Sequence, residues 1–171
     1  MYCLHYVAPE GFSDLEMQSD GEVLTRLVFL RTDEKHRPLS EREKRISLPV
    51  FCETVQYLDL YFSGAIPDFL PRFRLEGATP FRKAVSELLL KIPYGETVTY
   101  GDLAKELARL TGKKKMSAQA VGGAVGWNPL CILIPCHRVI GAKGDLVGYG
   151  GGIENKRRLL ALEASRGRIG T

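Results

Sequence analysis

The segment Ala118–Gly126, near the middle of the chain, restricts the possible folds more than any other feature of the sequence. Its apolar residues and the capping residue Ser117 before it predict a helix, yet it contains Gly122, Gly123 and Gly126. Each glycine costs about 1 kcal/mol of helix propensity relative to alanine. A helix with so few side chains either packs its backbone tightly against another helix or brings its backbone close to that of a nucleic acid. These residues alone leave both alternatives open.

The composition is that of a globular protein. The chain has 171 residues and a mass of 19.0 kDa, which suits one large domain or two small ones. Hydrophobic residues make up 44% and charged residues 26%, which excludes a disordered or collagen-like chain. The apolar stretch Leu130–Ile134 is far too short to cross a bilayer, and Met1–Glu10 lacks the pattern of a secretory signal. We therefore expect a cytoplasmic protein with no membrane partner.

Charge divides the chain into two parts. Residues 1–77 hold 9 Lys and Arg against 13 Asp and Glu, a net charge of -4, whereas residues 78–171 hold 15 against 7, a net charge of +8. Lys113–Lys115 lies directly before the glycine-rich helix. A basic region is typical of nucleic-acid binding through phosphate groups, although a solvated basic surface has the same composition. We predict two domains with these boundaries, 1–77 and 78–171.

The acidic part reads as strands followed by a helix. Asp20-Gly21 between apolar runs is a hairpin signal. The segments predict a small α/β domain with an antiparallel sheet: strands at Tyr2–Ala8, Leu15–Gln18 and Glu22–Leu30, a loop at Thr32–Lys44, a helix at Leu48–Phe62 and a connector at Pro67–Leu75.

The basic part reads as mostly helical. Thr79 and Pro80 form a typical helix start, and an apolar stripe follows them to Ile92. A helix, a basic turn, a helix and a β-ribbon in that order resemble a winged helix-turn-helix, so the chain as a whole is predicted to be α+β. The remaining predicted elements are a short strand at Thr97–Thr99, helices at Tyr100–Leu110, Ser117–Gly126 and Ile153–Ala164, a buried strand at Cys131–Ile134 and a glycine-rich hairpin or loop at Ala142–Gly152.

Cys136 and His137 are the strongest chemical signal. Sulfur reacts as the thiolate, so a working cysteine requires a nearby base or cation. Glu163 lies on the same helical stripe as Lys156 and Leu159, so it is expected to face inward, where a histidine is a suitable partner. The alternatives are a buried structural cysteine and a carboxylate that reaches water. We expect the other cysteines, Cys3, Cys52 and Cys131, to be buried structural cysteines.

Around these residues the sequence resembles the methylated-DNA–protein-cysteine methyltransferases, also called 6-O-alkylguanine-DNA alkyltransferases. The resemblance covers roughly Thr79–Glu163 and depends on five landmarks in order: Gly122-Gly123-Ala124, Asn128-Pro129, Pro135-Cys136-His137-Arg138-Val139, Gly148-Tyr149 and Gly151-Gly152. It implies DNA repair in which the alkyl group of a flipped 6-O-alkylguanine in double-stranded DNA moves irreversibly to the protein's own cysteine. It also implies one reaction per molecule, no cofactor and action as a monomer.

The resemblance assigns a role to each matching position. Cys136 would be the alkyl acceptor, His137 its base through a water molecule, and Glu163 the group that holds His137. Asn128 would brace the active-site turn, and Tyr100 would donate a proton towards the guanine. Base-binding residues would be Val125, Val139, Tyr149, Gly150 and Lys156, and DNA-binding residues would be Lys115, Gln119, Ala120, Gly122, Gly123 and Arg138.

The sequence departs from the family pattern on the recognition helix. Gln119 stands where the family commonly has an intercalating arginine, so charge and wedge action at that point are in question. Some family members also carry zinc in the N-terminal domain. The spacing of Cys3, His5, His36 and Cys52 matches no such pattern, and we expect no metal.

Three other functions fit parts of the pattern. A module that binds alkylated bases without repairing them would lack the cysteine that this chain has. A winged-helix regulator with a sensor cysteine would leave Asn128, His137 and Glu163 unexplained. A Cys-His hydrolase would require an oxyanion-hole signature, and none is evident beyond the glycine loop.

Overall fold

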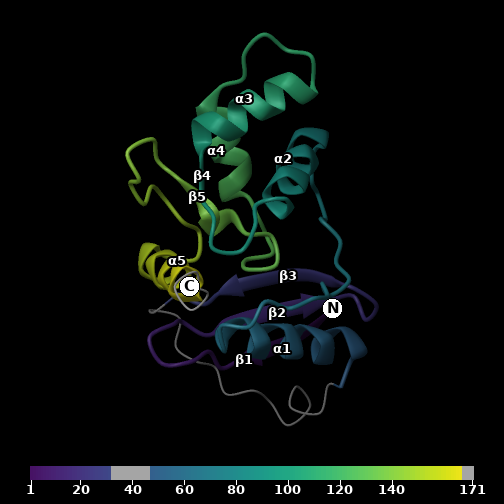
Figure 1. Ribbon diagram of the computed structural model, residues 1–171. Coiled ribbons are helices and arrows are strands. Elements are labelled where there is room, and N and C mark those ends of the chain that lie inside the picture. The colour runs from purple at the N-terminus through teal and green to yellow at the C-terminus, as the bar shows by residue number, and fades with distance from the viewer. Residues whose placement is uncertain (32–46, 167–171) are drawn as a thin grey trace. The chain divides into compact units, whose positions relative to one another are not determined.

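The computed structural model describes residues 1–31 and 47–166, so the loop predicted at Thr32–Lys44 lies outside the described residues. The chain is α+β and divides into two compact units, Met1–Glu76 and Gly77–Thr171 (Figure 1). Within the described ranges, no helix combines the length and the apolar character that a membrane span requires.

The first unit is a three-stranded antiparallel sheet with one helix. Strands β1 (Tyr2–Tyr6), β2 (Leu15–Ser19) and β3 (Leu24–Phe29) pair in chain order, and helix α1 spans Pro49–Phe62. The Asp20 carboxylate accepts hydrogen bonds from the backbone N–H groups of Glu22 and Val23, both at 2.9 Å, and so closes the predicted hairpin. Alternate residues of the strands and the inner face of α1 form the core, with Leu15, Met17, Leu27, Phe51 and Leu58 all buried.

The second unit is mostly helical. Its elements are α2 (Pro80–Leu90), β4 (Val98–Thr99), α3 (Tyr100–Leu110), α4 (Ala118–Gly126), a 3₁₀ turn (Cys136–Arg138), β5 (Val139–Ile140) and α5 (Ile153–Arg166). Side-chain oxygens of Thr79, Thr99 and Ser117 accept hydrogen bonds from backbone N–H groups in the first turns of α2, α3 and α4. The predicted starts of these helices are therefore confirmed.

The prediction of a buried strand at Cys131–Ile134 is wrong. These residues are buried, but the chain folds back on itself, with the N–H of Ile134 donating to the carbonyl of Leu130 at 3.0 Å. Ile132 adopts a φ of 70°, a left-handed conformation that a β-branched residue rarely takes. An apolar run shows that a segment is buried but does not show its backbone shape.

Residues 142–152 form a loop of turns without a strand, so the β-ribbon considered for a winged motif is not formed there. Val139–Ile140 pairs instead with Val98–Thr99, in parallel. This short pairing joins the segment that follows the 3₁₀ turn to the start of α3.

Candidate active site

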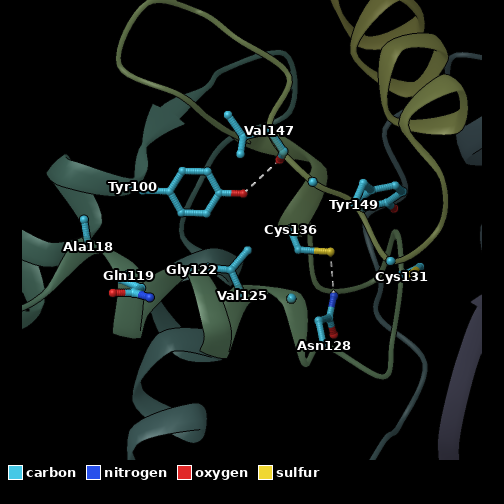
Figure 2. A pocket seen from close by; sticks show the side chains of 13 residues that line it. Tyr100, Ala118, Gln119, Gly122, Val125, Asn128, Cys131, Cys136, Val147 and Tyr149 are labelled. Carbon is cyan, nitrogen blue, oxygen red and sulfur yellow. Dashed lines mark hydrogen bonds between the residues drawn. The ribbon is translucent and has the colours of Figure 1, made fainter.

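A cavity of about 540 Å³ opens between α3, α4, the Asn128–Cys136 turn and the 147–150 loop (Figure 2). It brings together eight of the residues predicted from the sequence: Tyr100, Gln119, Gly122, Val125, Asn128, Cys136, Tyr149 and Gly150. Its lining also includes Cys131, which the sequence predicts to be a structural cysteine, and Val147, for which the sequence predicts no role. The other predicted residues do not line it: His137, Val139, Lys156 and Glu163 are buried outside the lining, Arg138 is mostly buried, and Lys115, Ala120 and Gly123 are exposed.

The Cys136 thiol is held by hydrogen bonds at the wall of this cavity. A hydrogen bond with the Cys131 thiol outweighs the opposing effect of burial and lowers the pKa of Cys136, and further lowering comes from Asn128 and from the positive charge of Lys156. The Asn128 amide nitrogen donates to the Cys136 sulfur at 3.0 Å (Figure 2). The thiolate, which is the reactive form of cysteine, is therefore favoured at this position.

Asn128 also closes the turn that carries the cysteine. Its amide nitrogen lies 2.8 Å from the carbonyl oxygen of Ile134 and 3.3 Å from that of Leu130. Its carbonyl oxygen accepts from the N–H of Leu130 at 3.0 Å. One side chain thus fixes both ends of the turn and contacts the sulfur as well.

Behind the cavity, His137, Arg138 and Glu163 form a buried ionic cluster. The His137 Nε2 lies 2.7 Å from Glu163 Oε1, and Arg138 donates to both carboxylate oxygens at 2.9 Å. Burial by itself would raise the pKa of Glu163, but the hydrogen bonds from His137 and Arg138 prevail and hold it far below its usual range. Burial also lowers the pKa of His137, despite the nearby carboxylate.

These directions define the protonation state of the cluster at neutral pH. Glu163 is ionised, and His137 is neutral. We assign the imidazole proton to Nε2, because a neutral imidazole beside a carboxylate donates its single N–H to it. The Nδ1 atom of His137 then carries a lone pair that is able to accept a proton.

Arg138 does not occupy the position expected of a DNA contact. Its guanidinium is mostly buried, bonded to Glu163 and to the carbonyl oxygen of Ile92 at 2.6 Å. A group held in this way is not available to a phosphate, so the structure gives Arg138 an internal role in place of the expected one. The sequence signal was its place two residues after Cys136, which indicates proximity to Glu163 only once the 3₁₀ turn is known.

Lys156 is a buried cation beside the cavity. Its ammonium group donates to the carbonyl oxygens of Val139 at 2.7 Å and Val147 at 3.2 Å, and lies 6.0 Å from the centre of the Tyr149 ring. Burial lowers the pKa of Lys156, and the nearby Cys136 opposes that effect. The side chain therefore joins β5 to the loop that forms one wall of the cavity.

Tyr100 forms the opposite wall. Its hydroxyl donates to the carbonyl oxygen of Val147 at 3.3 Å (Figure 2). Burial raises the pKa of Tyr100, and the charge of Cys136 raises it further, so the phenol stays protonated at neutral pH.

The glycines of α4 are not all explained by packing within the chain. A Cβ added at Gly122 would lie 3.8 Å from the Tyr100 ring, an ordinary contact. One added at Gly123 or Gly126 would meet no atom of the described residues within 4 Å. Gln119 is exposed at the edge of the cavity. Tight packing of helices, one of the two alternatives considered for this segment, therefore gives no reason for Gly123 and Gly126.

No group of three or more potential metal ligands occurs among the residues in the described ranges. Of the residues considered for zinc, His5 is hydrogen-bonded to Asp14 at 2.9 Å, Cys52 is exposed on α1, and His36 lies outside the described ranges.

Comparison with known proteins identifies relatives along nearly the whole chain. Residues 80–165 match the family described as 6-O-methylguanine DNA methyltransferase, DNA binding domain. The methylated-DNA–protein-cysteine methyltransferase of Mycobacterium bovis is 43% identical, over 95% of this chain and 94% of its own. That of Haemophilus influenzae is 41% identical, over 95% of this chain and 86% of its own.

Solved structures agree with these relatives. The crystal structure of Mycobacterium tuberculosis OGT in complex with DNA is similar with a TM-score of 0.76 and 39% identity, over 97% of this chain and 94% of that one. The O6-methylguanine-DNA methyltransferase of Pyrococcus kodakaraensis gives a TM-score of 0.61 and 28% identity, over 94% of this chain and 98% of that one.

Replacing Asn128 should make the thiol less acidic. In Asn128→Ala the thiolate of Cys136 loses one hydrogen-bond donor, so its pKa should rise and its reaction with iodoacetamide below pH 8 should slow, by about tenfold for a shift of one pKa unit. Peptide-resolved labelling across a pH series measures this. Cys52, in the other unit, serves as the control within the same molecule, and an unchanged profile for Cys136 would contradict the role of Asn128.

Proposed function

The chain belongs to the methylated-DNA–protein-cysteine methyltransferase family, and we propose that Cys136 is its alkyl acceptor. Its function is DNA repair by direct reversal. The thiolate sulfur attacks the alkyl carbon of 6-O-alkylguanine, a carbon–sulfur bond forms, and the carbon–oxygen bond breaks with its electron pair passing to the guanine. The observation that carries this proposal is a cavity that ends on a cysteine sulfur whose thiolate is stabilised.

His137 accepts the proton of Cys136 through a water molecule in this proposal. The neutral imidazole with its proton on Nε2 leaves Nδ1 as the base, and the ionised Glu163 stabilises the imidazolium that forms. Arg138 positions Glu163, since it donates to both carboxylate oxygens. The protonated Tyr100 supplies a proton to the departing guanine, so the base leaves in its neutral form.

The cavity binds the flipped base. Val125 and Tyr149 supply apolar contact, and the N–H of Gly150 faces the guanine oxygen. Lys156 and the backbone of Val139 support this wall from behind through their hydrogen bond. An alkylated guanine must leave the base stack to reach this cavity, because its alkyl carbon is not accessible to a thiolate inside a duplex.

Double-stranded DNA is the proposed partner, and α3, the Lys113–Lys115 turn and α4 act as a helix-turn-helix whose second helix enters the minor groove. The exposed face of α4 has small residues where a phosphate backbone would approach, with Gly122, Gly123 and Ala120 along it. Gln119 stands at the edge of the cavity, where it fills the gap left by the flipped base. Lys115 adds attraction to phosphate groups.

The protein acts once, as a monomer, without a cofactor. The product is a thioether, and none of the groups around Cys136 provides a route to cleave its carbon–sulfur bond. Each molecule therefore removes one alkyl group and is consumed.

The test of this function is the mass of the protein after reaction with duplex DNA that contains 6-O-methylguanine. We expect one added methyl group per molecule, located on Cys136 by peptide mapping. Cys136→Ala should take up none, and Cys52→Ala, which changes an exposed cysteine of the other unit, should react like the wild type. Multiple turnover, or methyl transfer by Cys136→Ala, would contradict the proposal.

Gln119→Arg should tighten DNA binding. The new charge adds a phosphate contact, so the slope of log affinity against log salt should steepen by about one unit. Repair should be as fast as in the wild type or faster, because the flipped state is held longer. Gln119→Ala should slow repair in DNA yet react normally with a free 6-O-alkylguanine base. If either variant only lowers the melting temperature, with the repair rate per folded molecule unchanged, Gln119 is structural.

Gly123→Ala separates protein stability from DNA binding. Because no atom of the described part of the chain lies within 4 Å of the added methyl group, the helix should gain up to about 1 kcal/mol of stability. DNA affinity should fall, since the methyl group stands where a phosphate backbone would approach. Thermal melts and equilibrium binding measure the two effects, and reaction with a free alkylated base is the control. If stability rises but DNA affinity does not fall, the DNA contacts the protein at a place other than Gly123.

A further inference from the structure

A second thiol lines the same cavity as the proposed alkyl acceptor. Cys131 and Cys136 are the two buried cysteines of the chain, and both line the cavity (Figure 2). The side chain of Cys131 also contributes to lowering the pKa of Cys136. The sequence predicts a structural role for Cys131, and the proposed transfer reaction does not use it.

The backbone, and not only the side chains, brings these thiols together. The five-residue step from Cys131 to Cys136 is folded back by hydrogen bonds from the N–H of Leu133 to the carbonyl of Cys131, at 2.8 Å, and from the N–H of Cys136 to the carbonyl of Ile134, at 2.8 Å. Asn128 secures the same turn from the side. The turn therefore holds both cysteines at the same cavity.

We propose that Cys131 is a resolving cysteine for Cys136: after a small hydroperoxide oxidises Cys136, Cys131 captures the product as a disulfide, and a dithiol reductant restores both thiols. The inference rests on the proposed role of Cys136 as a nucleophile. A nucleophilic thiolate and a second thiol on one turn, both lining a cavity of about 540 Å³ that admits a small oxidant, are the arrangement that such chemistry requires.

The steps balance as follows in atoms and electrons. The Cys136 thiolate attacks one oxygen of the hydroperoxide, the O–O bond breaks, and the departing oxyanion takes a proton from solvent, so sulfur is oxidised to a sulfenic acid while the peroxide is reduced. The Cys131 sulfur then attacks the Cys136 sulfur. The S–O bond breaks, and the leaving hydroxide combines with the proton of Cys131 as water. A dithiol reduces the disulfide by two exchange steps and is itself oxidised.

Recovery of the oxidised cysteine matters because the protein uses its acceptor only once. Without a partner, a sulfenic acid goes on to a sulfinic acid, which simple thiols do not reverse. A molecule lost in this way would repair nothing. Capture by Cys131 keeps the acceptor recoverable.

Mass spectrometry tests the proposal directly. Both cysteines lie in the peptide 116–138, which trypsin releases by cleavage after Lys115 and Arg138. After hydrogen peroxide treatment of the reduced full chain, we expect this peptide to lose two hydrogen atoms. Alkyl transfer should be lost with the same time course, and dithiothreitol should return it to its starting value.

Variants of Cys131 distinguish capture of the oxidised Cys136 by Cys131 from oxidation of Cys136 that continues to the sulfinic acid. In Cys131→Ala and Cys131→Ser the peptide should gain two oxygen atoms, and dithiothreitol should restore little of each variant's own activity before oxidation. Both the alanine and the serine variant are made in case one of them misfolds. Thermal melts check that each variant is folded. Cys52→Ala should match the wild type. Protein already methylated on Cys136 should form no disulfide.

Two results would overturn the proposal: equal yields of sulfinic acid in wild type and Cys131→Ala, or a disulfide from Cys136 to Cys3 or Cys52. Failure of the transfer function is distinguishable, because it would appear as a missing methyl group on reduced Cys136 whatever the oxidised peptide shows.

Discussion

The buried Glu163 carboxylate is the interaction on which the second unit depends. It accepts hydrogen bonds from His137 and Arg138 in the 3₁₀ turn and, at 3.0 Å, from the backbone N–H of Gly95 in the turn before β4. A buried carboxylate costs several kcal/mol unless its lone pairs are satisfied, so removal of any donor leaves an expensive group behind. Helix α5, the cysteine-bearing turn and the Gly95 turn are thereby fixed to one another. The position of Cys136 follows from an ionic cluster that it does not itself touch.

The same cluster links folding to protonation, and both groups act in the same direction. The pKa of Glu163 is depressed by folding, so its contribution to stability is present above the carboxyl pKa of the unfolded chain and is lost as pH falls towards the folded value. The pKa of His137 is also depressed, so acid favours the unfolded chain, which binds a proton first. The state with ionised Glu163 and neutral His137 is thus both the stable one and the one in which His137 can act as a base.

Local signals in the sequence were sufficient for the helices and for much of the site. Capping residues such as Thr79 and Ser117 mark helix starts through interactions within a few residues, and the stripe of α5 places Glu163 inward for the same local reason. The turn at Cys131–Ile134 was not predictable, because its shape depends on Asn128 bonds and on a left-handed Ile132 that no propensity favours. The surroundings of Arg138 and Cys131 depend on that shape, so the sequence alone could not place Arg138 on Glu163 or Cys131 at the cavity.

Packing within the chain does not account for the glycines of helix α4. Gly123 and Gly126 each give up about 1 kcal/mol of helix stability, and no neighbour among residues 1–31 and 47–166 requires them. Ser117 caps the helix, and its inner residues Val121 and Val125 are buried, so the helix is held by its inner face while its outer face stays bare. Natural proteins break local rules mainly where function demands it. An exposed helix surface with few side chains is a cost in the isolated chain and an advantage only when another backbone lies against it, as in the proposed contact with DNA.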